Sequence, residues 1–206
     1  MNLTMMDTIQ NLPSFESITE GRKKALQGVI TYIQEKVNSK KAVNLHFICT
    51  HNSRRSHLSQ IWAKIAAFHY DVSNVNCYSG GTEISEINHQ ILDTLKTQGC
   101  TIAQLSTGIN PIYAVKFTDN EPAIIAYSKK FDDIINPKSS FAAIMTCTDA
   151  DQGCPYIPGA EQRFSLAYED PKKSDGTPLQ TETYRLRSIE IATEMMFIFS
   201  KIEGSF

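Results

Sequence analysis

Cys49 and Arg55, with five residues between them, are the residue types whose spacing can do chemistry in this sequence. The cysteine ends a short apolar run, 45–49, and an amphipathic segment follows the arginine. In a loop between a strand and a helix, the backbone N–H groups can turn inward around the cysteine, and the positive end of the following helix points at the same cysteine. Such surroundings favour thiolates, so Cys49 is expected to ionise at neutral pH. A thiolate facing a tetrahedral oxyanion predicts nucleophilic attack at phosphorus or arsenic.

The side chains of this loop fit the same interpretation. Arg55 supplies a planar fork for two oxygens of the anion. Ser56 can donate a hydrogen bond to the thiolate, and Asn52 tolerates left-handed backbone geometry that would brace the loop. The alternative is a buried cysteine followed by a chance arginine. The apolar strand before the loop and the amphipathic helix after it favour the anion cradle.

The elements around the loop alternate between strand and helix patterns. Alternating apolar residues predict a strand over 42–48, and helical spacing predicts a helix over 58–68. Further along, the patterns predict a strand at 75–78, a helix at 86–96 stopped by Gly99, a hairpin at 112–127, a strand at 141–146, a loop at 148–160 and a final helix at 181–201. This alternation predicts βαβ units and a parallel sheet, with the cysteine loop at a carboxyl strand end, where such sheets bind ligands.

The N-terminal segment precedes this alternating pattern. Residues 1–13 have the pattern of a loose start, and Ser17 followed by Glu20 is a capping-box pattern before a helix over 17–38. We therefore expect a helical extension, residues 1–41, and a catalytic domain, residues 42–206.

Composition places the chain among ordinary globular proteins. It has 206 residues, of which 41% are hydrophobic and 20% charged, with a formal net charge of −2 that argues against nucleic-acid binding. The start has no signal-peptide pattern, and no apolar run approaches the ~18 residues of a membrane span. A cytoplasmic location is expected, where the five cysteines are reduced or redox-cycling rather than structural disulfides.

Residues 49–56, CTHNSRRS, resemble the signature of low-molecular-weight protein tyrosine phosphatases and of the arsenate reductases that share their fold. Residues 78–82, YSGGT, are similar to the small-residue segment after that family's second strand. The resemblance implies a three-layer α/β fold with a central four-stranded parallel sheet flanked by helices, here with an extra N-terminal helix. It implies that residues Thr50, His51, Asn52, Ser53, Arg54, Arg55 and Ser56 bind arsenate or a phosphate-like oxyanion.

Cys147 and Cys154 follow a predicted strand in a segment that resembles the redox segment of thioredoxin-coupled arsenate reductases. The chemistry needs them: a second thiol must release arsenite from Cys49, and a third must take over the disulfide for thioredoxin to reduce. The alternatives are two incidental buried cysteines, or a zinc pair, for which six intervening residues is a poor spacing. Cys77 and Cys100 are expected to be structural.

Asp170, just before Pro171, matches the general-acid position of the family, which implies that it protonates the departing oxygen. The alternatives are an ordinary Asp-Pro turn, or Glu169 as the acid. The histidines are scattered without metal-ligand spacing, so no metal and no cofactor is predicted.

Three positions depart from the family pattern. His51 replaces a glycine, so either the backbone needs no positive φ there or His51 is strained. Arg54 replaces a cysteine and either strengthens anion capture or faces solvent. Gln60 stands where some reductases use a carboxylate to hold potassium, which puts that ion site in doubt.

The leading hypothesis is a thioredoxin-coupled arsenate reductase. The alternative is a phosphatase for phosphotyrosine or small phosphoesters, which needs Cys49, Arg55 and Asp170 but neither of the two later cysteines. Residues 172–176 lack the tyrosines that tyrosine phosphatases of this fold carry after the Asp-Pro pair. A third hypothesis is a binding or redox-sensing module without turnover, which His51 and Arg54 keep open.

Overall fold

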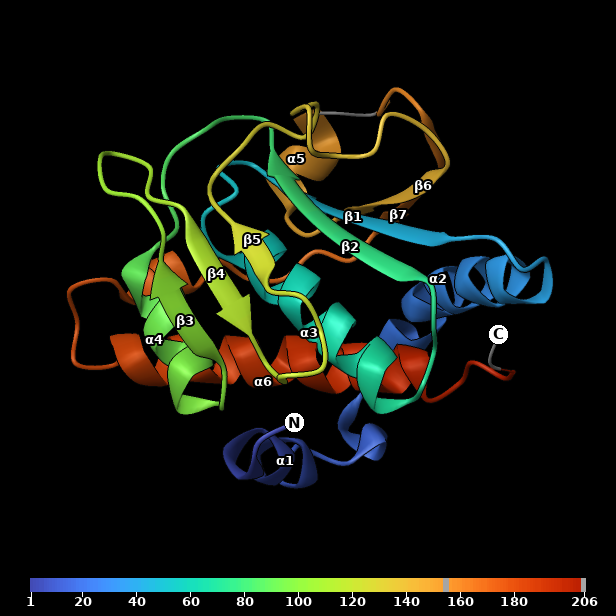
Figure 1. Ribbon diagram of the computed structural model, residues 1–206, viewed down its shortest axis with the longest axis horizontal. Helices are drawn as coiled ribbons and strands as arrows, with labels where there is room; N and C mark the ends of the chain where they lie inside the picture. The colour runs from blue at the N-terminus through green and yellow to red at the C-terminus, as the bar shows by residue number, and fades with distance from the viewer. Residues whose placement is uncertain (154–155, 205–206) are drawn as a thin grey trace.

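A sheet of four parallel strands forms the centre of the protein (Figure 1). The computed structural model describes residues 1–153 and 156–204, so Cys154 lies outside the described residues. The strand order is β2-β1-β6-β7, with bounds β1 Val43–Cys49, β2 Val75–Gly81, β6 Phe141–Met145 and β7 Ala160–Ser165. All three strand pairings are parallel. The predicted four-stranded parallel sheet is therefore confirmed.

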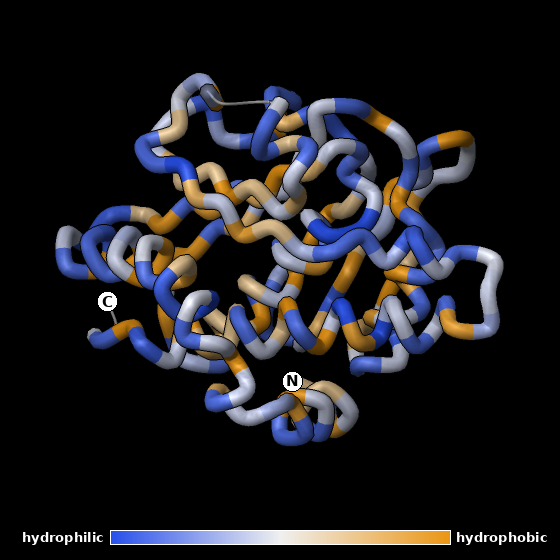
Figure 2. Tube along the Cα trace, turned by 180° about the vertical axis from the view of Figure 1, so that it is seen from behind, coloured by the Kyte–Doolittle hydropathy of each residue, from blue (hydrophilic) through white to orange (hydrophobic). Residues whose placement is uncertain are grey.

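Helices cover both faces of this sheet (Figure 1). The larger core contains the inward sides of three long helices, α2 Glu20–Asn38, α3 Arg55–His69 and α6 Gln180–Phe199. The short helix α5 Thr148–Gly153 packs on β1 and β6 in a second, smaller core. Figure 2 shows hydrophobic and hydrophilic stretches alternating along the helices, as expected of elements with one buried face.

Alternate residues of β1 enter the two cores. Val43, Leu45 and Phe47 belong to the larger core, whereas Ile48 and Cys49 belong to the smaller one. Strand side chains alternate between the two faces, which places Ile48 opposite to Val43, Leu45 and Phe47. Cys49, at the end of the strand, departs from this alternation and joins Ile48 in the smaller core. Cys49 therefore lies on the side of the sheet on which α5 packs.

A separate antiparallel sheet carries the insertion between the second and third parallel strands. It consists of β3 Thr101–Gln104, β4 Tyr113–Lys116 and β5 Ile124–Ala126, after helix α4 His89–Thr97. The predicted hairpin over 112–127 is confirmed by the pairing of β4 with β5. Strands β3 and β7 were not predicted, because both are short, half-exposed and stabilised by pairing with strands distant in sequence.

The prediction of a loose start over 1–13 is wrong, because residues Leu3–Gln10 form helix α1. The Asn2 side chain caps it by accepting from the Met5 N–H at 2.8 Å, and its amide donates to the carbonyl of Gly99. Gly99 has a φ of +105°, and a Cβ there would lie 2.5 Å from the backbone nitrogen of Met5. Docking of this helix therefore needs the close approach that only glycine permits.

The helix predicted over 17–38 begins later than its capping pattern indicated. Thr19, not Ser17, is the N-cap of α2, and its side chain accepts from the backbone N–H of Arg22. Ser17 ends a preceding 3-10 turn, Phe15–Ser17. The predicted strand at 75–78 extends to Gly81, and the predicted loop from 148 begins as α5. Among the described helices, none has the length and apolar character to cross a membrane.

Candidate active site

The loop from Thr50 to Arg54, between β1 and α3, turns its carbonyl groups away from its own interior. Carbonyls of this segment accept hydrogen bonds from surrounding elements, namely those of Cys49, Thr50, His51, Ser53 and Arg54. Within residues 1–153 and 156–204, no backbone N–H of 50–54 donates to a protein acceptor. Because backbone N–H groups require partners, this row of donors at the N-terminus of α3 suits an anion.

Asn52 holds the shape of this loop. It is fully buried with a φ of 44°, its amide donates to Ser56 Oγ at 2.8 Å, and its Oδ1 accepts from the Lys129 N–H at 3.0 Å. Ser56 Oγ lies 3.1 Å from Cys49 Sγ. Because Ser56 Oγ already accepts from Asn52, its own hydrogen is available to the cysteine sulfur.

The left-handed backbone position of the loop is Asn52, and His51 does not share it. Of the two alternatives for His51, the backbone there therefore needs no positive φ. The His51 side chain is 53% exposed, and its Nε2 lies 3.4 Å from a carboxylate oxygen of Glu83. His51 thus contributes its backbone to the loop and directs its side chain toward the rim.

Arg55 is buried at the first position of α3, where two partners orient its guanidinium. Nη1 donates to the carbonyl of Tyr168 at 3.0 Å, and Nη2 donates to Asp170 Oδ2 at 2.6 Å. Asp170 also caps the turn Pro171–Ser174 by accepting from the Lys172 N–H. The geometry brings together the predicted arginine and the predicted general acid, from segments 115 positions apart.

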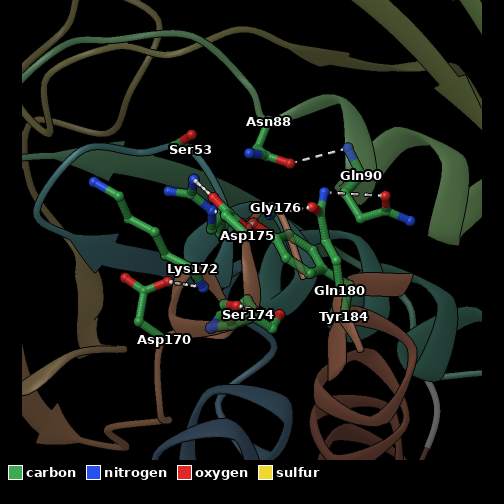
Figure 3. Close-up of polar contacts among 12 residues, drawn as sticks. Ser53, Asn88, Gln90, Asp170, Lys172, Ser174, Asp175, Gly176, Gln180 and Tyr184 are labelled. Atoms are coloured by element: carbon green, nitrogen blue, oxygen red, sulfur yellow. Dashed lines mark hydrogen bonds and ion pairs between the residues drawn. The ribbon is translucent and has the colours of Figure 1, made fainter. Parts of the chain in front are cut away.

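A cavity of about 430 Å³ opens over this loop. Its lining comes from the loop, the segment before α4, the first turn of α5 and the segment after Asp170: Thr50, His51, Ser53, Arg54, Arg55, Ser85, Glu86, Asn88, Asp149, Asp170 and Lys172. Figure 3 shows Ser53 and Asn88 above Asp170 and Lys172. No phenylalanine, tyrosine or tryptophan is among these described lining residues, so the cavity is polar and fits a small oxyanion.

Arg54 is held at the edge of the cavity by a closed set of polar contacts. Its Nε donates to the Tyr184 hydroxyl at 2.7 Å and its Nη2 lies 3.0 Å from Asp175 Oδ2, while the hydroxyl donates to Asp175 Oδ1 at 2.6 Å (Figure 3). Burial and the bond to Asp175 raise the pKa of Tyr184 to about 12. Arg54 therefore does not face solvent, and its charge is shared with Asp175. Sequence patterns could not indicate these partners, which lie more than 120 positions away.

Cys147 follows β6 and lies beside the loop, fully buried. Its Sγ is 3.4 Å from Thr50 Oγ1 and 3.4 Å from the N–H of Ala150, in the first turn of α5. Cys49 and Cys147 belong to the same small core, and both are free thiols. Two of the three cysteines singled out from the sequence are thus brought together.

Residues 127–131, after the antiparallel sheet, support the back of the loop. Ser128 Oγ donates to the His51 carbonyl, and the carbonyl of Lys129 accepts from the N–H of Gly81. Gly81 pairs with Cys49 in the sheet, and a Cβ on it would lie 2.6 Å from the carbonyl oxygen of Thr50. The insertion therefore shapes the site, and the small residues after β2 let the loop approach the strand.

Lys129 brings a buried amine behind the loop. Its side chain is among the largest fully buried ones, its Nζ lies 3.4 Å from Ser79 Oγ, and burial lowers its pKa to about 8. A lysine in a polar stretch gives no signal of burial in the sequence, so this residue was missed. Gln60, at the doubtful ion position, is also buried and donates to the carbonyl of Cys77.

Cys77 and Cys100 lie apart from the cavity. Burial raises the pKa of each thiol to about 12, which disfavours the reactive thiolate. Among the described side chains, no three from His, Cys, Asp and Glu gather closely enough to bind a metal ion.

The sheet order and the cysteine loop at the end of β1 define an α/β protein with the fold of low-molecular-weight protein tyrosine phosphatases. A solved structure, a mutant of YwlE from Bacillus subtilis, matches 77% of this chain and 97% of its own length with a TM-score of 0.50. At 15% identity this likeness concerns the fold alone. No family model matches the chain.

In sequence, the chain is similar to bacterial arsenate reductases. The one from Staphylococcus aureus (strain Newman) is 29% identical over 151 residues, which are 73% of this chain and 92% of the relative. The one from Bacillus licheniformis is 28% identical over 142 residues, 68% of this chain and 80% of the relative. The chain is thus similar in sequence to arsenate reductases and shares its fold with low-molecular-weight protein tyrosine phosphatases, which confirms the predicted resemblance.

Proposed function

We propose that this protein is an arsenate reductase in which Cys49, Cys147 and Cys154 act in turn and thioredoxin restores the thiols. Residues 42–206 would form the catalytic domain behind the helical extension 1–41. The cytoplasm, where thiols stay reduced, is the compartment in which this relay would work. The observation that carries the proposal is the burial of Cys147 against the anion loop, because a phosphatase would need no second thiol there.

The position of Cys147 supports disulfide formation with Cys49. The Thr146 N–H donates to the carbonyl of Ile48 at 2.7 Å, so the two strands are still paired next to both cysteines. Adjacent strands lie about 4.8 Å apart, and disulfides join Cα atoms about 4.4–6.8 Å apart. Cys147 stands one residue beyond the position opposite Cys49, which a short local movement could bridge.

In the first step, the N–H groups of the loop and the Arg55 fork would hold the oxygens of arsenate. The thiolate of Cys49, stabilised by the Ser56 hydroxyl, attacks arsenic. The bond from arsenic to the hydroxyl group opposite the new S–As bond breaks, and Asp170 gives its proton to this departing hydroxyl, which leaves as water. Asp170 must exchange its bond to Arg55 for one to the anion during this step.

In the second step, the thiolate of Cys147 attacks the sulfur of Cys49. The electron pair of the S–As bond passes to arsenic, which leaves as arsenite, and a disulfide joins Cys49 to Cys147. Two thiols have then supplied the two electrons that reduce As(V) to As(III). Cys154 attacks Cys147 and frees Cys49, and the dithiol of thioredoxin reduces the resulting disulfide.

The polar cavity supports arsenate over an aryl phosphate. A phosphotyrosine ring would need aromatic or apolar walls, whereas the described lining is polar and charged. Hydrolysis of small phosphoesters remains the alternative function, because Cys49, Arg55 and Asp170 suffice for it.

Thioredoxin-dependent oxidation of NADPH with arsenate tests the proposal, with p-nitrophenyl phosphate hydrolysis followed in parallel. We expect Cys147→Ala and Cys154→Ala to abolish arsenate reduction while hydrolysis survives. Cys100→Ala is the matched control, because this buried thiol lies apart from the cavity. An absence of arsenate-driven oxidation in the wild type, with phosphoester hydrolysis that depends on Cys49, would contradict the reductase function.

A further inference from the structure

The orientation of Arg55 depends on one short segment, residues 166–170. Both of its hydrogen-bond acceptors, the carbonyl of Tyr168 and the carboxylate of Asp170, belong to this segment. The segment follows β7 without continuing it as a strand, although the N–H of Tyr168 still donates to the carbonyl of Thr146 at 3.1 Å. A shift of this segment would therefore move the guanidinium fork and the proposed acid together.

The other side of the same segment contacts a charge pair whose carboxylate is buried and whose guanidinium is partly exposed, with side-chain exposures of 5% for Glu194 and 23% for Arg22. Arg22 makes a bidentate contact with Glu194, at 2.6 Å and 2.9 Å, and the Tyr168 hydroxyl donates to the same carboxylate at 2.7 Å. Arg22 also stacks 4.7 Å from the centre of the Tyr168 ring and donates to the carbonyl of Ala167 at 3.3 Å. The Arg22 guanidinium thus contacts the backbone before Tyr168, the ring of Tyr168 and the carboxylate that accepts from the Tyr168 hydroxyl.

The carboxylate and tyrosine side of this clamp of Arg22, Glu194 and Tyr168 is buried. The Tyr168 residue is 4% exposed and Glu194 is 3% exposed, so the carboxylate is almost removed from water. Within the described residues, Arg22 is the only basic side chain that forms an ion pair with Glu194. Loss of one partner from such a pair leaves an uncompensated buried charge, which forces the neighbours to rearrange.

The clamp joins the N-terminal extension to the reaction site. Arg22 lies in the first turn of α2, and the Thr19 cap accepts from its backbone N–H at 3.2 Å. We infer that Arg22 is a positioning residue, which sets the Arg55 fork for the anion through Glu194 and Tyr168. This inference rests on the anion-binding role of Arg55 in the proposed function, and it makes the extension part of the active site.

Protection of Cys49 against alkylation tests the inference without any reductase partner. The rate of iodoacetamide modification at Cys49, followed by mass spectrometry at increasing inorganic phosphate, gives an apparent affinity for the oxyanion. We expect Arg22→Ala to weaken phosphate protection about 10-fold, because small misplacements of positioning groups have large effects. Arg22→Lys should recover part of the loss, since lysine keeps the charge but lacks the planar fork.

Lys36→Ala is the matched control. Lys36 also lies in α2 and pairs with Glu161 of β7 at 2.6 Å, and among the described residues no hydrogen bond or ion pair joins it to segment 166–170. Phosphate protection within twofold of wild type in Lys36→Ala, together with the loss in Arg22→Ala, supports the inference. Unchanged phosphate protection in Arg22→Ala overturns the inference. An equal loss of protection in Lys36→Ala also overturns it, because the effect would then come from the docking of α2 and not from Arg22 itself.

A second variant keeps the test decisive where Arg22→Ala does not fold, as judged by circular dichroism. Tyr168→Phe keeps the ring and the carbonyl but removes the hydroxyl bond to Glu194, so phosphate protection should weaken about threefold; no change would overturn the inference. The two proposals can fail separately. If phosphate protects Cys49 in the wild type but not in Arg22→Ala, and the wild type reduces no arsenate, the proposed function is wrong and the inference is still supported.

Discussion

Replacement of Asn52 should destabilise the anion loop by an amount that its contacts allow us to estimate. The side chain is fully buried, donates to Ser56 at 2.8 Å and accepts from the backbone of Lys129 at 3.0 Å. Asn52→Gly and Asn52→Ala both remove these bonds. A stranded buried N–H costs about 1–3 kcal/mol and a lost neutral hydrogen bond about 1 kcal/mol, so each variant should lose about 2–4 kcal/mol of unfolding free energy.

The two variants should differ because of the backbone. Asn52 has a φ of 44°, where alanine is disfavoured by about 1–2 kcal/mol. Glycine avoids that strain, but it makes the unfolded chain more flexible, which lowers the unfolding free energy by about 0.4–1 kcal/mol. Asn52→Gly should therefore be more stable than Asn52→Ala by about 1 kcal/mol.

Urea unfolding followed by far-UV circular dichroism measures both differences, with iodoacetamide reactivity of Cys49 as a local readout. Ser174→Ala, which changes a buried hydroxyl outside the loop, controls for general loss of packing. The reasoning is refuted if both Asn52 variants lose less than about 0.5 kcal/mol, or if Asn52→Ala is the more stable of the two.

Three further outcomes are expected. Gly81→Ala should lower activity and stability, because its Cβ would lie 2.6 Å from the carbonyl oxygen of Thr50; activity and thermal unfolding equal to wild type would contradict this. Burial and the charge of Lys129 lower the pKa of His46 to about 3, so the unfolded state binds more protons between pH 6.5 and 3. Stability should fall by at most about 1.4 kcal/mol per unit as pH drops through that window, and His46→Phe should flatten the urea-derived profile. With pKa values near 12, Cys77 and Cys100 should remain unmodified by iodoacetamide at pH 8 in the native protein, as mass spectrometry of the labelled peptides would reveal.

Patterns local in the sequence determined most of the predicted elements. The strand before Cys49 and the helix after Arg55 are each contiguous, so period and propensity suffice to locate them. Helix α1 and strand β7 could not be found that way. The helix is held by the contact of its cap with Gly99, and the strand by pairing with β6.

For the site, the sequence by itself determined the cysteine loop and the Asp-Pro pair, because the residues of each are neighbours along the chain. Only the tertiary structure decided that Asp170 meets Arg55, that Lys129 supports Asn52 from behind, and that Arg22 reaches Tyr168. These contacts join residues more than 70 positions apart, and they depend on how strands and helices pack rather than on any repeating pattern. A buried charge or amide acquires its role only from the groups that surround it after folding.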